Sequence, residues 1–439
     1  MYELGGVNEA ELNRLGTEAG MKNAEAGGKD FNQFNVMFLR SKTDTFVKGG
    51  MPMDPSRTSF PLRGSVTFED QRRLTLVDTP GYGQMFLDNI IYGVYIADVA
   101  LLLVEAKVGL RSDRANVEHR SGAENIAKIL ASFRVPVVAI LVTKMDAVGY
   151  SQSAFEEVKE EVELHVWPIL KPYHSEQPPI IPISALSRVG ITTTSVEDAA
   201  WYSGVNVLQV IEQTKVTTNR PTDKVRFAIE GGKEVYSPPG VGTVLVGSLE
   251  SGMLHSNDRL ILEPASTKRG EAITIHARSI QRARSVTEKR GVTVSEIASR
   301  AIVAIATTAS ELSRKDAEIY LSHGGILGLC GDPPRVATEI KAELIFFERG
   351  VVYSGKDYAI YPNASRGTAR IRQIESRGTL EPQKGSAYEA GESERMVAIL
   401  RMAQPICIEC SDEFRRLTRF VLREQNSIVA CGRCIEILR

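Results

Sequence analysis

The sequence has no hydrophobic run that could cross a bilayer, no low-complexity tract and few cysteines. Its longest apolar runs, at residues 99–104 and 135–142, fall far short of the roughly 20 residues that a transmembrane helix needs. Residues 1–15 lack the apolar core of a signal peptide. Five cysteines among 439 residues are too few for a disulfide-stapled secreted chain. We therefore expect a soluble, cytoplasmic protein without a membrane partner.

An excess of charge of one sign is also missing. Lysine and arginine number 53 and aspartate and glutamate 54, a formal net charge of −1, so the composition as a whole does not indicate nucleic-acid binding. Residues 1–219 are nevertheless net negative and residues 220–439 net positive. This division suits C-terminal domains that face RNA, and scattered surface charge explains it equally well. The length predicts two or three globular domains.

A short apolar strand that ends in Asp-x-x-Gly organises the N-terminal half. The strand is Leu74–Val77, and Asp78-Thr79-Pro80-Gly81 follows it. Open α/β sheets bind ligands at the carboxyl ends of their strands, where a carboxylate can hold Mg²⁺ through water. A glycine there lets its N–H approach a phosphate because it has no Cβ. The motif alone is weak, since a strand that ends in a Pro-Gly turn gives the same pattern.

Two later strand ends carry the features of guanine recognition. Each follows an apolar run: Val137–Val142 leads into Thr143-Lys144-Met145-Asp146, and Ile180–Ile183 leads into Ser184-Ala185-Leu186. The Asp146 carboxylate can accept two hydrogen bonds from the guanine edge, which adenine cannot offer. The Lys144 stem can lie along the base, and the Ala185 N–H can meet the guanine oxygen. Three such motifs in this order predict a GTPase-type domain.

With these motifs the chain resembles elongation factor 1-alpha and its relatives, which include the GTP-binding release factor of termination and the Pelota-partner GTPase of ribosome rescue. The resemblance lies in residues 81–106, the interval 143–186, Ala200-Trp201-Tyr202, Arg220–Lys224 and residues 419–430. It covers essentially the whole chain, at low similarity between the motifs. It implies a translational GTPase that binds GTP or GDP with Mg²⁺.

The resemblance also implies a role for each matching residue. The base would be bound by Thr143, Lys144, Asp146, Ser184, Ala185 and Leu186. Asp78 would hold Mg²⁺ through water, and Gly81 would meet the γ-phosphate. The Mg²⁺ ligand from the first switch would be Thr58 or Ser59, because Thr67 lies too near Asp78 and belongs to the strand between them.

Two departures from the family weaken the catalytic side of the site. Tyr82 stands where the family has the histidine that helps to orient the attacking water, and tyrosine cannot become a cation, so we expect slow hydrolysis. No Gly-x-x-x-x-Gly-Lys-Ser/Thr phosphate loop occurs in the chain, and the central strand that precedes this loop is missing too. Either the sequence starts at an internal methionine of a longer protein, which we favour, or the protein has discarded GTP.

The pattern of elements predicts a GTPase-type α/β domain followed by two antiparallel β-barrels. Helical patterns at residues 115–133 and 153–166 alternate with the apolar strands, as in a parallel sheet. After Arg220 the pattern changes to short strands separated by glycine and proline. We expect a truncated GTPase-like domain at 1–219 without its first strand, a barrel at 220–333 and a second barrel at 334–439.

The strands that we expect fall into two sets. The first barrel would contain residues 225–229, 242–248, 259–262, 272–276 and 301–306. The second would contain residues 342–347, 358–361, 396–401, 406–409, 419–422 and 428–438. Within the first lies a basic cluster, either an RNA-phosphate contact or a solvated loop, formed by Arg278, Arg282, Arg284, Lys289 and Arg290.

Four cysteines have the spacing of a zinc ribbon, Cys407-x-x-Cys410 and Cys431-x-x-Cys434. Both pairs lie in segments expected to be strands, where residues three apart point to opposite faces. Gly432 could permit a metal-binding turn at the second pair. Buried free thiols are the favoured interpretation.

The leading functional prediction is a translation factor GTPase of the elongation factor 1-alpha type. It would act as a monomer and carry aminoacyl-tRNA, or a tRNA-mimicking release or rescue factor, to the ribosomal A site while GTP is bound. The alternative is a degenerate, non-hydrolysing scaffold for the ribosome, a release-type factor or RNA-decay machinery. The missing phosphate loop and Tyr82 favour the scaffold, whereas the intact guanine motifs favour the GTPase.

Overall fold

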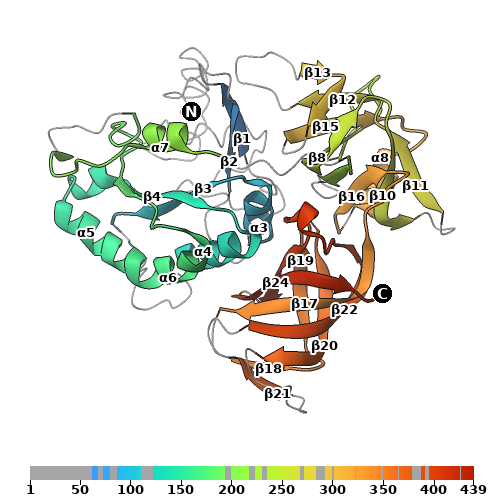
Figure 1. The fold of residues 1–439 in the computed structure, drawn as a ribbon. Coiled ribbons are helices and arrows are strands. Elements are labelled where there is room, and N and C mark those ends of the chain that lie inside the picture. The colour runs from blue at the N-terminus through green and yellow to red at the C-terminus, as the bar shows by residue number, and fades with distance from the viewer. Residues whose placement is uncertain are drawn as a thin grey trace, which may run out of the picture. The chain divides into compact units, whose positions relative to one another are not determined.

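The computed structural model of the chain describes most residues from Leu62 onward (Figure 1). The described residues are 62–67, 73–79, 87–107, 109, 122–192, 199–216, 223–229, 235–266, 271–282, 292–298, 301–321, 323–347, 350–363, 365–377, 387–390, 395–425 and 427–439. They form two compact units, which divide after Val216.

A three-stranded parallel sheet lies at the centre of the first unit. Its order is β3 (Ala100–Glu105), β4 (Val137–Thr143) and β5 (Ile180–Pro182). The middle strand β4 is the most apolar of the three, and Ala139, Ile140 and Val142 are fully buried in it. A strand covered on both faces is typical of a parallel sheet between helices. The parallel α/β prediction is confirmed.

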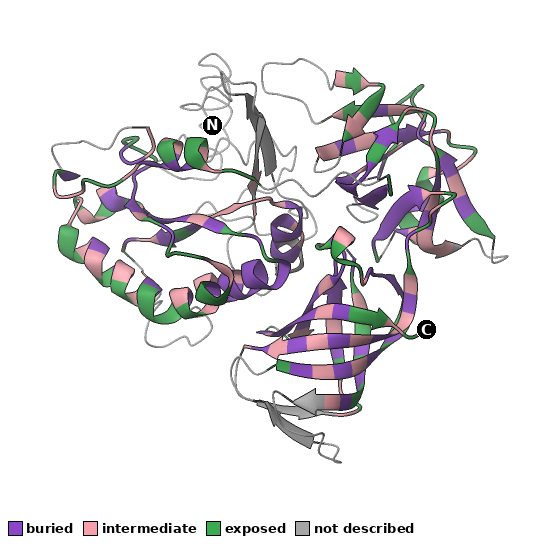
Figure 2. Ribbon diagram, in the orientation of Figure 1, coloured by how far each residue is buried: buried purple, intermediate pink, exposed green. Residues whose placement is uncertain are grey.

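Helices lie before, between and after the strands of this sheet along the chain. They are α3 (Leu87–Ile96), α4 (Gly122–Phe133), α5 (Gln152–Glu161), the π-helical turn η4 (Val162–Val166), α6 (Trp167–Leu170) and α7 (Val207–Gln213). Ser151 caps α5 by accepting a hydrogen bond from the Ala154 N–H, and Asn206 caps α7 through a reciprocal pair with Gln209. Helix α4 is largely buried, whereas much of α5 is exposed (Figure 2).

A β-hairpin precedes the parallel sheet. Strand β1 (Leu62–Thr67) pairs in antiparallel fashion with β2 (Arg73–Asp78). Thr67 therefore belongs to the hairpin strand, as expected. In the described part of the chain the hairpin and the three-stranded sheet are separate sheets.

An antiparallel sheet of nine strands opens the second unit. Eight of its strands follow one another in the order β11-β10-β16-β6-β8-β15-β12-β13, and β7 pairs with β8 beside this path. Their bounds are β6 (Arg226–Ile229), β7 (Val235–Tyr236), β8 (Thr243–Ser251), β10 (Arg259–Ser266), β11 (Ala272–His276), β12 (Ser279–Arg282), β13 (Val292–Val294), β15 (Ala301–Thr307) and β16 (Gly325–Leu329). The short pair β9 (Met253–His255) and β14 (Glu296–Ala298) and the helix α8 (Arg314–Tyr320) complete it.

This nine-stranded sheet curves around one core, which includes Phe227, Leu245, Leu260 and Ile305. The five strands predicted for it are all present. The sheet is a half-barrel rather than a closed one, because the described residues do not join its end strands β11 and β13.

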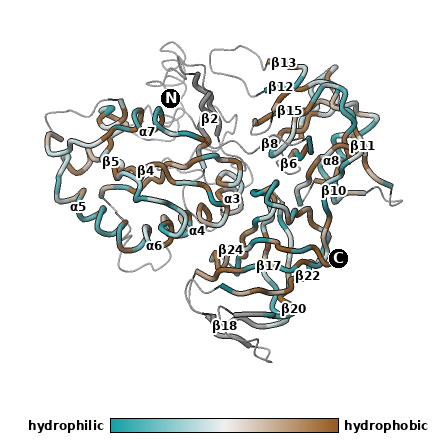
Figure 3. Tube along the Cα trace, viewed as in Figure 1, coloured by the Kyte–Doolittle hydropathy of each residue, from teal (hydrophilic) through white to brown (hydrophobic). Residues whose placement is uncertain are grey.

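A closed six-stranded barrel forms the rest of the second unit. Its strands, in order around the barrel, are β17 (Val336–Phe346), β22 (Arg395–Cys407), β20 (Gly367–Arg377), β19 (Asp357–Pro362), β23 (Arg419–Glu424) and β24 (Ser427–Ile437). A separate hairpin pairs β18 (Gly350–Tyr353) with β21 (Ala387–Ala390). Apolar and polar residues alternate along the barrel strands (Figure 3), which buries one face of each strand.

The barrel corrects two expectations about individual strands. Residues 396–401 and 406–409 were expected to be two strands, but β22 is one continuous strand from Arg395 to Cys407, with an irregularity in its pairing to β17. Strand β20 was not expected. Its sequence contains three arginines and one glutamate, because the outer face of a barrel strand is solvated, and these polar residues obscure the apolar alternation.

Candidate guanine-recognition site

The predicted base-binding residues lie together at the carboxyl ends of β4 and β5. Because these strands are parallel and adjacent, their ends meet at one edge of the sheet. Two hydrogen bonds fix the chain beyond these ends: the Ile183 N–H donates to the Val142 carbonyl at 2.8 Å, and the Met145 N–H donates to the Ile183 carbonyl at 3.2 Å. The motifs at 143–146 and 184–186, some 40 residues apart, therefore form one surface.

Asp146 is held in place by Ser184. The Ser184 hydroxyl donates to Asp146 Oδ1 at 2.5 Å, and the Ser187 N–H donates to the Ser184 hydroxyl at 3.2 Å. Ser184 is fully buried, whereas Asp146 is half-buried. A hydrogen bond to an ionised carboxylate is stronger than a neutral one, and a carboxylate has further acceptor sites beyond the one that Ser184 uses. Asp146 is thus oriented and retains acceptor capacity for a ligand.

Lys144 adopts a backbone conformation that is uncommon for a residue with a side chain. Its φ is 58°, in the left-handed region, just before the 3₁₀ turn η3 (Met145–Val148). Its Nζ lies 2.7 Å from Glu105 Oε2 at the end of β3. Thr143 donates its hydroxyl to the Val104 carbonyl at 3.4 Å. Strain of this kind clusters at functional sites.

The loop after β5 provides the other side of this surface. Ala185 and Leu186 are exposed, and the Leu186 side chain is 57% exposed. The Ser187 hydroxyl bonds to the Tyr150 hydroxyl, and the Trp201 indole N–H donates to the Tyr150 carbonyl at 2.9 Å. A flat heterocycle can place one face on the exposed Leu186 side chain while its edge meets the Asp146 carboxylate. This arrangement is typical of ligand sites, where most of the ligand's surface is buried against apolar groups.

The residues predicted for the phosphates and the metal are described less completely. Asp78 is the last residue of β2, and only its backbone belongs to the described structure. Thr58, Ser59, Gly81 and Tyr82 lie outside the described residues. The residues present therefore fit the base half of a guanine nucleotide, whereas the phosphate half and Mg²⁺ depend on the sequence alone.

The four cysteines with zinc-ribbon spacing do not form a metal site. Among the described residues, no group of His, Cys, Asp and Glu side chains could hold a metal ion, and none of the five cysteines forms a disulfide. Burial raises the pKa of the Cys434 thiol to about 12, which disfavours the thiolate that zinc needs. Gly432 instead makes room for an aromatic ring, since a Cβ there would lie 2.1 Å from Phe420 Cζ.

The basic cluster of the half-barrel is described only in part. Arg282 ends β12 and Arg278 precedes that strand, while Arg284, Lys289 and Arg290 lie outside the described residues. The choice between an RNA contact and a solvated loop stays open on this geometry.

Three contacts of the site did not follow from the sequence motifs. Glu105 pairs with Lys144, and Tyr150 and Trp201 support the loop after β5. A signal for Glu105 was present, because a carboxylate ends the apolar run 100–104 at the strand end that lies beside Thr143. Tyr150 and Trp201 gave no such signal, since their contacts join residues 37 and 51 positions apart.

Comparison with known protein families gives two matches. A family described as the elongation factor Tu GTP binding domain matches residues 17–218. A family described as the GTP-eEF1A C-terminal domain-like matches residues 339–435.

Individual relatives extend these matches across the chain. Elongation factor 1-alpha of Pyrobaculum calidifontis is 28% identical over 380 residues, covering 85% of this chain and 79% of that protein. Elongation factor 1-alpha of Pyrococcus furiosus is 27% identical and covers 100% of this chain and 93% of that protein.

Two solved structures share the fold. The Ski7 GTPase-like domain of S. cerevisiae, bound to GDP and inorganic phosphate, has a TM-score of 0.72 at 14% identity, covering 99% of this chain and 92% of that one. Elongation factor SelB of Methanococcus maripaludis, in complex with a GTP analogue, has a TM-score of 0.62 at 16% identity, covering 87% and 76%.

A GTPase-type sheet with base-recognition motifs at its strand ends, followed by two antiparallel β-units, defines the class of translational GTPases. Within this class the chain belongs to the elongation factor 1-alpha family. Among the described helices, none combines the length and the apolarity needed to cross a bilayer.

Proposed function

We propose that this chain is a translation factor that recognises a guanine nucleotide and delivers aminoacyl-tRNA, or a tRNA-mimicking release or rescue factor, to the ribosomal A site. The observation that carries the proposal is the hydrogen bond from the buried Ser184 hydroxyl to Asp146 Oδ1. It supports a carboxylate oriented to accept the two N–H donors of a guanine edge. Adenine presents no such pair of donors and would leave the carboxylate without them.

The other base contacts follow from the same edge of the sheet. The aliphatic stem of Lys144 would cover one face of the base, and the exposed Leu186 the other. The Ala185 N–H would donate to the guanine oxygen, and Thr143 would fix the turn through its bond to the Val104 carbonyl. Asp78, Gly81 and Thr58 would serve Mg²⁺ and the γ-phosphate. Bound GTP with Mg²⁺ would supply the switch between two arrangements of the protein.

The domain plan proposed for this function is a GTPase-like domain at 1–219 and β-domains at 220–333 and 334–439. The change from a parallel α/β sheet to antiparallel β-structure supports the first boundary, and the proline-containing segment between β16 and β17 supports the second. The protein would act as a monomer in the cytoplasm, with the ribosome as its partner.

A second candidate is a scaffold of the same family that does not hydrolyse GTP. Two sequence features favour it, the absent Gly-x-x-x-x-Gly-Lys-Ser/Thr motif and Tyr82 in place of the family's histidine. Tyr82 would be poor at orienting an attacking water, because it stays neutral at pH 7. Such a scaffold could bind the ribosome, a release-type factor or RNA-decay machinery.

A nucleotide titration separates these two functions. Labelled GDP, GTP and ATP are titrated into the protein, and ribosome cosedimentation is measured with and without a non-hydrolysable GTP analogue. The proposal expects guanine-selective binding and ribosome association that increases with the analogue. Ribosome association that is independent of any guanine nucleotide would instead establish the scaffold.

A further inference from the structure

A groove on the first unit is lined by none of the residues predicted to bind the base, although Trp201, which lines it, also bonds to the Tyr150 carbonyl beside that site. Its volume is about 410 Å³, and its walls are α5 with η4 on one side and the segment 201–204 on the other. Gln177 and Pro178, which precede β5, and Ile180, its first residue, line it as well. A cavity of this size is at the lower end of the range for small ligands, so it can hold one or two side chains.

The floor of this groove is aromatic and ordered. The Phe155 ring packs on the Trp201 ring at 5.2 Å between centroids, and Tyr202 lies 6.2 Å from each of them. Phe155 is buried, whereas Trp201 and Tyr202 are half-exposed. The Tyr202 hydroxyl donates to the Val205 carbonyl at 2.9 Å and Trp201 to the Tyr150 carbonyl, so both polar tips are directed into the protein. The ring surfaces thus remain for a ligand.

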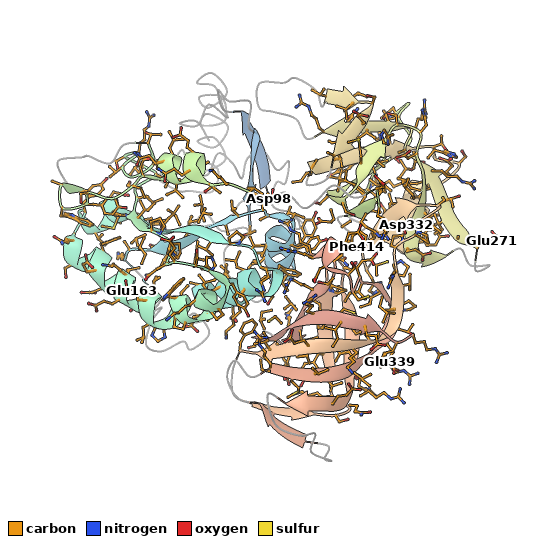
Figure 4. All side chains as sticks on the ribbon, in the orientation of Figure 1. Asp98, Glu163, Glu271, Asp332, Glu339 and Phe414 are labelled. Carbon is orange, nitrogen blue, oxygen red and sulfur yellow. The ribbon has the colours of Figure 1, made fainter. Side chains whose placement is uncertain are left out.

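The wall of the groove is acidic. Residues 152–166 contain five glutamates and one lysine, and two of these glutamates, Glu156 and Glu163, line the groove. Lys159 also lines it and pairs with Glu156 at 3.1 Å, so these two charges offset each other and Glu163 gives the groove its net negative charge. The hydrogen bond that Glu163 accepts, at 3.4 Å, comes from the neutral amide of Gln177, which leaves its negative charge in place. Glu163 lies on the outer side of the unit (Figure 4).

We propose that this groove binds a short segment of a partner protein that presents an arginine flanked by apolar residues. A planar guanidinium can stack on the Trp201 and Tyr202 rings while it pairs with the Glu163 carboxylate, which an ammonium group does less well. The acidic wall disfavours nucleic acid, whose phosphates it would repel. This inference does not depend on nucleotide binding.

The partner segment would bind through its side chains rather than as an added strand. Strand β5 ends the described order β3-β4-β5, and Ile180 at its start lines the groove. Pro178 and Pro179 precede it, however, and proline has no N–H to donate to a new strand. The specificity therefore comes from the aromatic floor and the glutamates.

A tryptophan titration tests this proposal on the full chain. The chain has two tryptophans, so Trp167→Phe leaves Trp201 as the single reporter inside the groove. The probe is a synthetic peptide with a central leucine–arginine–leucine sequence, and the control peptide has glutamate in place of the arginine. We expect a saturable change in Trp201 emission with the arginine peptide only, reproduced by anisotropy of the labelled peptide.

Matched variants distinguish this groove from general attraction to an acidic helix. Glu156→Gln with Glu163→Gln removes two charges that line the groove, whereas Glu157→Gln with Glu160→Gln removes two exposed charges of α5 that do not. We expect affinity on the order of fivefold weaker for the first pair and nearly unchanged for the second. Equal losses for the two pairs, equal binding of the glutamate peptide, or no binding of the arginine peptide would each overturn the proposal.

Discussion

Two polar clusters of this chain are built from similar side chains but differ in how completely they are buried. At the sheet edge proposed to recognise the base, Lys144 is 61% exposed and Glu105 34%, and Asp146 is half-buried. At the junction of the half-barrel and the closed barrel, Arg226 and Glu409 are 2% and 3% exposed, with 2.8 Å between Arg226 Nε and Glu409 Oε1.

At this junction the charged side chains are paired with other groups of the protein. Arg226 also donates to the Asp332 carboxylate at 2.9 Å and to the carbonyls of Val225, Asp332 and Pro333, and its guanidinium lies 4.8 Å from the centre of the Phe414 ring. Asp332 and Phe414 are labelled at this junction in Figure 4. Buried charges with this many partners hold structure together, whereas half-exposed, lightly bonded ones are available to a ligand.

Removal of the charge of Arg226 is the change expected to have the largest effect. Arg226→Met leaves the Glu409 carboxylate buried without its main partner, which should lower the free energy of unfolding by about 3–5 kcal/mol. Urea unfolding followed by circular dichroism measures the loss, and hydrogen exchange at β22 locates it.

Arg370→Met is the matched control. Its bidentate pair with Asp357 is exposed, so its loss should cost about 0–1 kcal/mol. Equal losses would contradict the comparison.

Removal of the Ser184 hydroxyl should affect binding more than folding. Ser184→Ala frees Asp146 Oδ1 from its hydrogen bond, and guanine-nucleotide affinity should fall by about tenfold, the effect of one hydrogen bond to a charged group. A fluorescence titration with labelled GDP measures it. Ser132→Ala removes an equally buried hydroxyl that bonds within α4 to the Lys128 carbonyl, and it serves as the control, with an expected change below about twofold. If both variants bound alike, Ser184 would have no orienting role.

Acid should weaken the half-barrel through Glu311. Partial burial alone would raise the pKa of Glu311, but hydrogen bonds from His276, Thr307 and Thr308 outweigh it and lower the pKa to about 2. The ordinary pKa is 4.5, so the unfolded chain binds this proton first. The contribution of Glu311 to stability is therefore complete above pH 4.5 and is lost as the pH falls toward 2.

Glu311→Gln should make the stability of the half-barrel less dependent on pH in that window. Hydrogen exchange at β15, measured between about pH 2 and 5, follows the change. The control is Glu318→Gln, which alters an exposed pair with Arg314 on α8. If the stability of Glu311→Gln depended on pH in the same way as that of the wild type, the Glu311 carboxylate would not cause the loss of stability in acid.

Removal of the Glu105 charge should have the smallest effect. Its pair with Lys144 is exposed, so Glu105→Gln should change the free energy of unfolding by less than about 1 kcal/mol. A carboxylate at the end of β3 opposes an anionic ligand at the same sheet edge, so the affinity for GTP should rise by about twofold to fivefold. Titration at low and high salt measures it. A weaker GTP affinity would mean that Glu105 positions Lys144 for binding.

The sequence predicted the elements of the fold correctly where the signal was a local pattern. The apolar runs 137–142 and 180–183 predicted two adjacent parallel strands, and the turn chemistry after Arg220 predicted antiparallel β-structure. It failed where tertiary packing decides the outcome. The sequence favoured buried thiols over a metal-binding turn at Gly432, but it could not show that this glycine makes room for the Phe420 ring on a neighbouring strand.

The proposed base site shows the same contrast between local sequence patterns and tertiary contacts. The motifs located Asp146 and Ser184 on two strand ends, because parallel strands end at one edge. They did not indicate Glu105 as the partner of Lys144, since an ion pair between residues 39 positions apart leaves no periodic signal.

The most direct test of guanine recognition is a change of base specificity in Asp146→Asn. A carboxylate accepts from both N–H donors of guanine, whereas an amide accepts from one donor and donates to one acceptor, which matches xanthine. Titration with GDP and xanthosine diphosphate should show a preference for GDP in the wild type and for the xanthine nucleotide in Asp146→Asn. Loss of all nucleotide binding without that reversal, or unchanged GDP affinity, would contradict the assignment of this sheet edge to the base.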